Sequence, residues 1–160
     1  MKVLVVSDSH GNNTNLRKAI ANMGEYLDLL IHLGDSEGNF ESIKSLVSCP
    51  VYAVRGNCDS SSELPGAQLV DIGPYRAFIT HGNRYGCTTS FELMREIARE
   101  NGAQIVMYGH THIPIIDRSD DITVVNPGSI SKPRQEGHRP TYLVMTIEED
   151  KRVEYSIVSM

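Results

Sequence analysis

Apolar runs alternate with amphipathic stretches through the first third of the chain. Residues 2–8 (KVLVVSD), 27–35 (LDLLIHLGD) and 51–57 (VYAVRGN) each predict a buried strand that ends in polar residues. Residues 13–23 and 39–47 predict helices between them, with one apolar face each, formed by Leu16, Ala19, Ile20 and Met23 and by Phe40, Ile43, Leu46 and Val47. Buried strands joined by crossover helices are typical of a parallel α/β sheet, which forms its crevice where the strands end.

Extended runs dominate after Ser60. Residues 67–82 contain two such runs around Gly73 and Pro74, which predicts a hairpin. Residues 88–102 predict a helix that ends at Gly102. Its inward face is predicted as Phe91, Met94, Ile97 and Ala98, and its N-cap as Thr88, Thr89 or Ser90. A strand over residues 104–110 follows, and four β-branched segments then predict a mostly antiparallel second sheet: residues 113–117, 122–128, 141–147 and 152–158. We expect one α/β domain over residues 1–160, with two packed sheets and helices outside.

Composition narrows the class of protein. The chain has 160 residues, of which 40% are hydrophobic and 22% charged, as in ordinary globular proteins. Its formal net charge is -5 and its Lys and Arg residues are scattered, so long duplex nucleic acid is not expected as a partner. Cys49, Cys58 and Cys87 form no CxxC pair, which favours a reducing compartment, and we expect a cytoplasmic protein. Every apolar run is shorter than the ~20 residues of a membrane span, so no membrane association is expected.

Potential metal ligands stand where the predicted strands end, and the stretch YGHTHIP (108–114) contributes two of them. The set is Asp8, His10, Asp35, Asn57, His81, His110 and His112. Imidazole and oxygen donors suit first-row divalent metals, and seven donors exceed what one tetrahedral ion uses. The pattern therefore predicts two ions, which at a spacing of ~3.5 to 4 Å can clamp both the attacking and the leaving oxygen of a phosphate ester.

Six motifs between residues 7 and 134 carry a family resemblance: SDSHGN, LGDSEGN, VRGNCD, THGNRYG, YGHTHIP and VNPGSISKPR. The sequence resembles the calcineurin-like metallophosphoesterase superfamily. Its GNCD and NPGSISKPR segments look most like the small bacterial and archaeal phosphodiesterase branch, to which the retromer subunit is related in fold. The resemblance implies a double β-sandwich of two mixed sheets flanked by helices.

The resemblance also implies an activity and a set of roles. Asp8, His10, Asp35 and His112 would hold one ion and Asn57, His81 and His110 the other, with Asp35 bridging. The implied reaction is in-line attack on a small phosphodiester by a hydroxide that bridges two divalent ions. Manganese is the leading expectation, while Ni, Fe, Co or Zn would also suit these donors. The amide of Asn57 can in addition donate to the phosphate.

Cys58 departs from the family pattern, since many members have histidine at this position. A thiol, with an ordinary pKa of ~8.5 against ~6.5 for imidazole, is a poorer proton donor at neutral pH. We therefore expect a preference for diesters with good leaving groups, with packing under the site as the alternative role of Cys58. Asn12, Arg55 and Arg134 are candidates to contact phosphate, against ordinary capping or solvated roles. His32 is expected to be a packed residue and His138 a solvated loop residue.

Two other classes of function compete with the enzyme. A scaffold of the same fold would tolerate losses among the ligand positions, whereas all seven are filled here by competent residues. A structural zinc protein is disfavoured because the ligands include no thiolate cluster and are far apart in the sequence. The motifs leave open the natural substrate, the metal and the oligomeric state, for which a homodimer is compatible with the resemblance.

Overall fold

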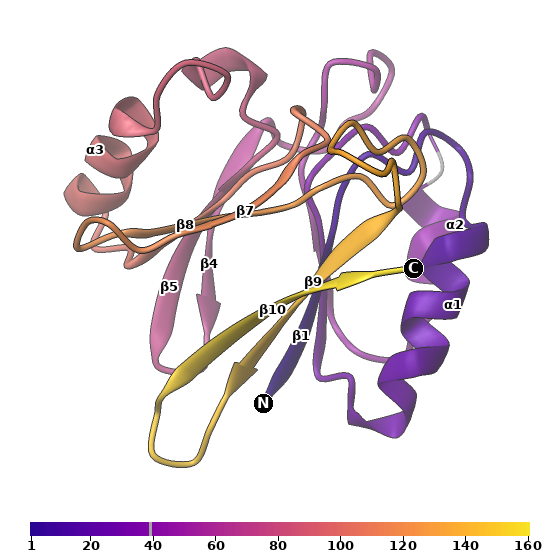
Figure 1. Ribbon diagram of the computed structural model, residues 1–160, viewed down its shortest axis with the longest axis horizontal. Coiled ribbons are helices and arrows are strands. Elements are labelled where there is room, and N and C mark those ends of the chain that lie inside the picture. Colours follow the sequence, from indigo (N-terminus) through magenta and orange to yellow (C-terminus); the bar gives the residue numbers. More distant parts are fainter. Residues whose placement is uncertain (39) are drawn as a thin grey trace.

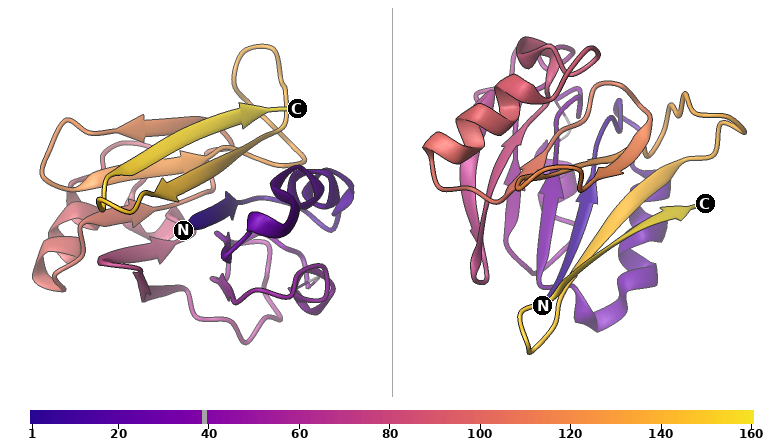
Figure 2. Two further views of the ribbon diagram at one scale, coloured as in Figure 1. Left: turned by 90° about the horizontal axis from the view of Figure 1, so that it is seen from below. Right: turned by 60° about the vertical axis from the view of Figure 1, so that its left-hand side comes forward.

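The computed structural model describes residues 1–38 and 40–160, and two five-stranded mixed sheets dominate it (Figures 1 and 2). The first sheet has the strand order β10-β9-β1-β2-β3, and the second has the order β4-β5-β6-β8-β7. The strands are β1 (Lys2–Val6), β2 (Leu29–His32), β3 (Val51–Ala53), β4 (Ala67–Ile72), β5 (Tyr75–Thr80), β6 (Ile105–Met107), β7 (Pro114–Asp117), β8 (Thr123–Pro127), β9 (Thr141–Ile147) and β10 (Val153–Ser159). This architecture confirms the predicted fold class.

The first third of the chain forms the predicted parallel unit. β1 pairs in parallel with β2, and β2 with β3. The crossover helix α1 (Thr14–Met23) buries Leu16 and Ala19 against this sheet and is followed by the short 3-10 helix η1 (Gly24–Tyr26). Helix α2 (Phe40–Lys44) is shorter than the predicted 39–47, and Asn39 lies outside the described residues. Leu46 and Val47 still pack on the same apolar cluster, since burial does not require them to be helical.

The four C-terminal strands do not form one antiparallel sheet, so that expectation is wrong. β9 and β10 extend the first sheet, where β9 is antiparallel to β1. β7 and β8 join the second sheet, where β8 is parallel to β6. The alternation of apolar residues gives the buried face of each strand but leaves its neighbour undetermined, and both sheets offered an edge of suitable polarity.

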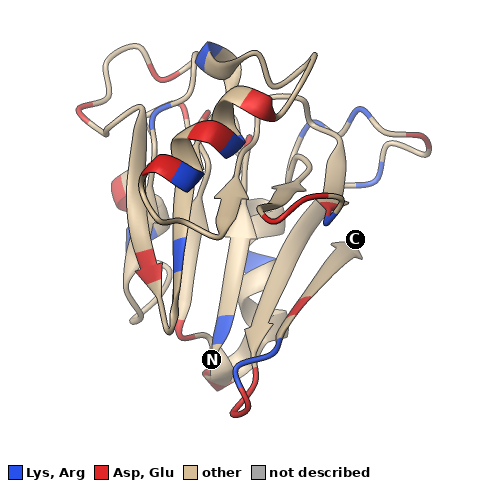
Figure 3. Cartoon of the chain, turned by 90° about the vertical axis from the view of Figure 1, so that its left-hand side faces the viewer, with Lys and Arg blue, Asp and Glu red and all other residues tan. Residues whose placement is uncertain are grey.

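The predicted hairpin and third helix are present. β4 and β5 pair antiparallel around Gly73, which has a positive φ of 58°. Helix α3 (Glu92–Glu100) begins later than predicted, after the 3-10 helix η2 (Asn83–Tyr85). Phe91 occupies the N-cap position, while the predicted cap Ser90 accepts a hydrogen bond from the N–H of Glu92 at 3.1 Å. Acidic and basic residues lie side by side on α3 (Figure 3). Within the described ranges, no helix is long and apolar enough to cross a membrane.

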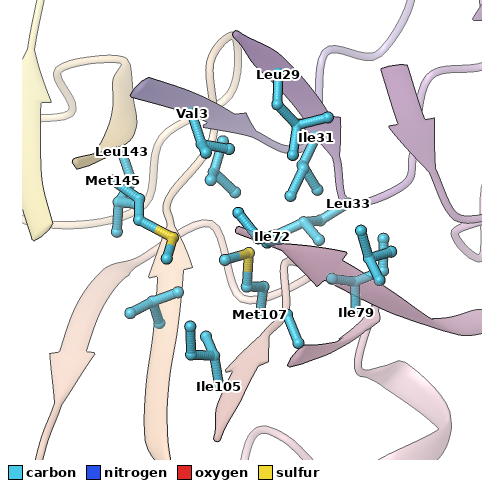
Figure 4. Packing of buried hydrophobic residues seen from close by; sticks show 14 of the residues in the cluster. Val3, Leu29, Ile31, Leu33, Ile72, Ile79, Ile105, Met107, Leu143 and Met145 are labelled. Atoms are coloured by element: carbon cyan, nitrogen blue, oxygen red, sulfur yellow. The ribbon is translucent and has the colours of Figure 1, made fainter. Parts of the chain in front are cut away.

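The main core lies between the two sheets (Figure 4). Val3, Ile31 and Leu143 of the first sheet face Ile79 and Met107 of the second, all with side chains removed from water. Packing of this kind fixes the two sheets relative to each other. As a consequence, the carboxyl ends of the parallel strands of both sheets lie at one edge, where their loops gather opposite the N-terminus (Figure 1).

Candidate metal centre

Five of the predicted ligands adopt a backbone conformation that side-chain-bearing residues rarely use. Their φ angles lie in the left-handed region: Asp8 57°, His10 45°, Asp35 55°, His110 66° and His112 60°. Such residues cost free energy, and they cluster at functional sites where the surrounding structure holds them in place. Backbone hydrogen bonds join two of these loops, from the N–H of Asp8 to Gly34 and from the N–H of His10 to Asp35.

Three histidines are held with the same nitrogen facing inward. Nδ1–H of His81 donates to the carbonyl of Leu33 at 2.7 Å, and that of His112 donates to the carbonyl of Lys132 at 2.6 Å. A carbonyl oxygen only accepts, so Nδ1 must carry the proton in both rings. His10 makes the equivalent bond to the carboxylate of Glu37, also at 2.6 Å. The Nε2 atoms of all three rings therefore face the cluster, where each neutral ring presents a lone pair, which is the arrangement of metal-binding histidines.

These lone pairs converge on a buried carboxylate. Nε2 of His10 lies 3.5 Å from Nε2 of His112, which lies 3.0 Å from Oδ1 of Asp8. Asp8 is fully buried, and among the described residues nothing donates a hydrogen bond to its Oδ1. Two lone pairs and an anionic oxygen at such distances repel one another unless a cation lies between them. The residues present thus fit a divalent cation.

Asp35 joins this group to a second set of donors. Its Oδ2 lies 3.9 Å from Nε2 of His10 and 3.5 Å from Nε2 of His81. Burial opposes ionisation of Asp35, but the hydrogen bond and charge of His81 and the N–H of Cys58 outweigh it and hold its pKa well below the usual range. Burial likewise opposes a charge on His81, but Asp35 and Asp8 outweigh it and raise its pKa. Both shifts indicate an electrostatic environment that favours positive charge.

Asn57 and His110 complete the predicted ligand set. They lie on its outer side, the side that is more exposed to solvent. Oδ1 of Asn57, an exposed residue, lies 3.1 Å from Nε2 of His81. The ring of His110 stands edge-on to that of His81 with centroids 5.1 Å apart, and its backbone N–H donates to Oδ2 of Asp8. Burial, followed by the neighbouring His81, lowers the pKa of His110 and keeps its imidazole neutral, as ligation requires.

The described residues contain three groups whose donor atoms all lie within 4.8 Å of one another. They are Asp8, His10 and His112; Asp8, Asp35 and His81; and His10, Asp35 and Cys58. The overlap of these groups shows that side chains up to 104 positions apart in the sequence share one cluster. A single cluster of mixed carboxylate and imidazole donors can hold divalent first-row metals.

Cys58 lies at the surface of this cluster, so its alternative role of packing under the site is wrong. Its backbone N–H donates to Oδ1 of Asp35 at 2.8 Å, and its thiol accepts a hydrogen bond from Nδ2 of Asn57. Desolvation and the nearby carboxylate of Asp35 raise the pKa of the Cys58 thiol to about 11. Cys49, Cys58 and Cys87 are all free thiols.

Two acidic residues that the sequence patterns do not single out organise the loops. Glu37 orients His10 through the bond already described. The buried carboxylate of Asp59 accepts hydrogen bonds from the backbone N–H groups of Gly56 and Glu37 and from the hydroxyl of Ser36. It thereby ties the loop after β3 to the loop after β2. The GNCD segment contains Asp59, but its role depends on a contact 22 positions away.

Three polar residues fasten the C-terminal side of the cluster. The hydroxyls of Ser129 and Ser131 both donate to the backbone carbonyl of Asp8, at 2.9 and 2.8 Å. Buried Asn126 donates to the carbonyl of Gly109 and to the hydroxyl of Thr111, which holds the loop that carries His110 and His112. The NPGSIS segment therefore supports the ligand loops and does not itself supply a predicted ligand.

Gly56, in the VRGNCD segment, lies so close to Asp35 that a side chain would not fit there. A Cβ atom at Gly56 would overlap the carboxylate and the backbone nitrogen of Asp35. A side chain at this position would therefore displace the carboxylate shared by both sides of the cluster.

The remaining candidates from the sequence fall outside the ligand cluster. His32 is packed as expected, with its ring bonded to the hydroxyl of Ser9 and the N–H of Gly34, and burial lowers its pKa to about 4. The side chain of Asn12 accepts a hydrogen bond from the N–H of Thr14, the first residue of α1, whose N-cap residue is Asn13. Arg134 and His138 are exposed in the loop before β9, and Arg55 is half-buried beside Asn57. A contact of Asn12, Arg55 or Arg134 with phosphate stays a prediction.

The fold and this cluster of donors define a metallophosphoesterase. The chain belongs to the calcineurin-like phosphoesterase superfamily, whose domain matches residues 1–150. It is 33% identical over 150 residues to the probable metallophosphoesterase YsnB of Bacillus subtilis, covering 94% of this chain and 86% of the relative. It is 30% identical over 146 residues to a phosphodiesterase of Methanocaldococcus jannaschii, covering 80% and 83%. This family membership makes the chain a phosphoester hydrolase that uses divalent metal ions.

Solved structures agree with this fold. A predicted phosphoesterase of Streptococcus pneumoniae superimposes with a TM-score of 0.81 at 26% identity, covering 99% of this chain and 97% of that one. Vps29 of Entamoeba histolytica, solved with Zn²⁺, superimposes with a TM-score of 0.78 at 20% identity and covers 99% of both chains. The second likeness shows the fold alone.

Proposed function

We propose that this chain is a binuclear phosphodiesterase, in which Asp8, His10, Asp35 and His112 hold one divalent ion and Asp35, Asn57, His81 and His110 hold the other. When bound, two such ions supply a hydroxide nucleophile at neutral pH and neutralise charge on the phosphoryl group. The proposal includes manganese as the first metal to test and a small phosphodiester as the substrate.

One observation carries the proposal: Nε2 of His112 faces Oδ1 of Asp8 at 3.0 Å with no hydrogen bond to join them. Nδ1–H of His112 is already used, so the contact becomes favourable only when a cation, either a metal ion or a second ring proton, lies between Nε2 and Oδ1. On the other side of Asp35, Nε2 of His81 lies 3.5 Å from Oδ2 of Asp35 and 3.1 Å from Oδ1 of Asn57, and this convergence of donors supports a second ion.

Each side chain has a distinct task in this proposal. Asp35 contributes to both ions, because its Oδ2 lies within 3.9 Å of a histidine of each set. Asn57 offers Oδ1 to the cluster and keeps Nδ2 on its exposed side, where the amide can donate to a phosphoryl oxygen and orient the substrate. Glu37 and the carbonyls of Leu33 and Lys132 hold the imidazoles in the correct tautomer.

The test compares hydrolysis of bis-p-nitrophenyl phosphate, a diester, with that of p-nitrophenyl phosphate, a monoester. Protein stripped of metal by chelation is assayed alone and after addition of Mn²⁺, Ni²⁺, Co²⁺, Fe²⁺ or Zn²⁺. We expect no hydrolysis without metal and a faster diester reaction with at least one ion. Inactivity with every ion would contradict the proposal.

The alternative is a non-catalytic protein-interaction module of the same fold. The likeness to Vps29 supports this alternative only through the fold. The complete set of seven ligand residues favours the enzyme. A module would bind metal without hydrolysing either ester, an outcome that the same assay detects when the metal content is measured in parallel.

A further inference from the structure

A polar cavity lies directly beside the candidate metal centre. Its volume is about 360 Å³, and two glycines line it together with Arg55, Asn57, Ser60, Thr80, Asn83 and Arg84. Asn57 belongs to both places, since its Oδ1 is 3.1 Å from Nε2 of His81. A substrate whose scissile phosphate lies at the metal centre would therefore extend one of its ester groups into this cavity.

Both charged residues of the cavity are cations without an acidic partner. Arg55 and Arg84 have no carboxylate within 4.0 Å in the described part of the chain, and the only hydrogen bond recorded for either guanidinium is a 3.4 Å contact from Arg55 to the carbonyl of Ser62. Four arginines elsewhere are paired with carboxylates (Arg76, Arg95, Arg99 and Arg152), and what distinguishes Arg55 and Arg84 from the other unpaired arginines of the described residues is that they line one cavity. Two unpaired guanidinium groups in one concavity of a protein with net charge -5 favour an anionic ligand.

The other residues that line the cavity indicate which kind of anion it can bind. Described residues of the lining supply hydroxyl and amide groups, and none of them is aromatic or a large aliphatic on which a nucleobase would stack. The hydroxyl of Thr80 already donates to the carbonyl of Gly66 at 3.1 Å, so it shapes the wall. A cavity at the small end of the ~300–1,000 Å³ range of ligand sites, with guanidinium forks, matches a phosphate group better than a base.

We propose that this cavity binds a second phosphate group of the substrate, so that the enzyme prefers phosphodiesters that carry a further phosphate over those that do not. The inference rests on the proposed function, because it places the scissile diester at the metal centre. Arg55 and Arg84 act as specificity-determining residues, and their positions are coupled to the metal cluster because Arg55 lies two residues before Asn57 and Arg84 three residues after His81.

The test uses three thymidine dinucleotides that share one diester bond: TpT without a further phosphate, pTpT with a 5′-phosphate and TpTp with a 3′-phosphate. For the Mn²⁺-loaded protein we expect kcat/KM to be about ten- to a hundredfold higher for at least one phosphorylated form than for TpT. Arg84→Gln and Arg55→Gln should each lower this ratio toward one. Arg17→Gln, which removes the same charge from the exposed face of α1, should leave the ratio unchanged.

A binding measurement provides a readout without catalysis. Inorganic phosphate is titrated calorimetrically into metal-free protein in the presence of chelator, and we expect binding that the Arg55→Gln/Arg84→Gln double variant loses. Thermal unfolding checks that the variants are folded.

If the protein hydrolyses bis-p-nitrophenyl phosphate but shows equal kcat/KM for the three dinucleotides, the inference is overturned and the proposed function stays intact. Phosphate binding that survives the double substitution would also overturn it. Failure to hydrolyse any diester would overturn the proposed function and, with it, the assignment of the cavity to a substrate phosphate.

Discussion

The two sides of the proposed metal centre differ in how firmly the protein holds the candidate ligands. On the inner side, Asp8 and His112 are buried and the side chain of His10 is 7% exposed. On the outer side, His81 is also buried and oriented, but Asn57 is exposed and His110 half-buried, and the His110 ring makes no hydrogen bond among the described residues. Oriented and buried ligands give higher metal affinity. We infer that the inner ion binds more tightly than the outer one.

Removal of the shared carboxylate should have the largest effect, because it weakens both sides together. We expect Asp35→Asn to lower kcat/KM for bis-p-nitrophenyl phosphate by more than about a hundredfold and to lower the content of both ions. Cys58→Ser is the comparison, because this variant keeps the backbone N–H that donates to Oδ1 of Asp35 at 2.8 Å. Equal activity of the two variants would contradict the assigned roles.

Substitutions of single ligands should distinguish the two sides of the proposed centre. We expect His112→Gln to release the tighter ion, because its Nε2 meets Asp8 at 3.0 Å, whereas His110→Gln should release only the weaker one and leave one ion per chain. Elemental analysis after dialysis at limiting metal measures both. If His110→Gln removes the tighter ion, the proposed difference between the sides is wrong.

Substitution of Glu37, which orients the inner ligand His10, should have an intermediate effect on metal affinity. Glu37→Gln replaces the carboxylate that accepts Nδ1–H of His10 at 2.6 Å, and we expect a loss of about 10- to 100-fold in affinity for the inner ion. Isothermal titration with Mn²⁺ measures this affinity. Glu41→Gln, four positions further on the exposed face of α2, is the control and should show wild-type binding.

The smallest effect on activity is expected for substitution of Cys58, which is exposed on the outer side. Cys58→His introduces an imidazole, a better proton donor at neutral pH than a thiol. We expect faster turnover of monoesters with poor leaving groups, by less than about a hundredfold, and little change for p-nitrophenyl diesters. Phosphate release from an alkyl monoester measures the gain. An unchanged rate would mean that proton donation at this position does not limit the reaction.

The candidate ligands of both sides could be singled out from the sequence to the same extent, because both sets follow buried strands. Strand ends of a parallel sheet meet at one edge, which is why Asp8, Asp35 and Asn57 could be grouped before their positions were known. The residues that hold the ligand loops in place could not be predicted from the sequence. Asp59, Asn126 and Ser129 act through contacts between loops, and a loop path depends on the whole packed fold.

The sheet assignment failed for a related reason. The hairpin of β4 and β5 is local and carries its own turn signal, so the sequence patterns were sufficient there. β8 and β9 instead also pair with strands that are not adjacent to them in the sequence, β6 and β1. Their alternating patterns fit either sheet, and only the packing of both sheets around one core decides between them.

The most direct test of the binuclear centre is anomalous diffraction from crystals grown with Mn²⁺. The account predicts two peaks per chain, ~3.5 to 4 Å apart, both in contact with the carboxylate of Asp35. One peak should contact His112 and the other His81. A single peak at saturating Mn²⁺, or two peaks that do not share Asp35, would contradict it.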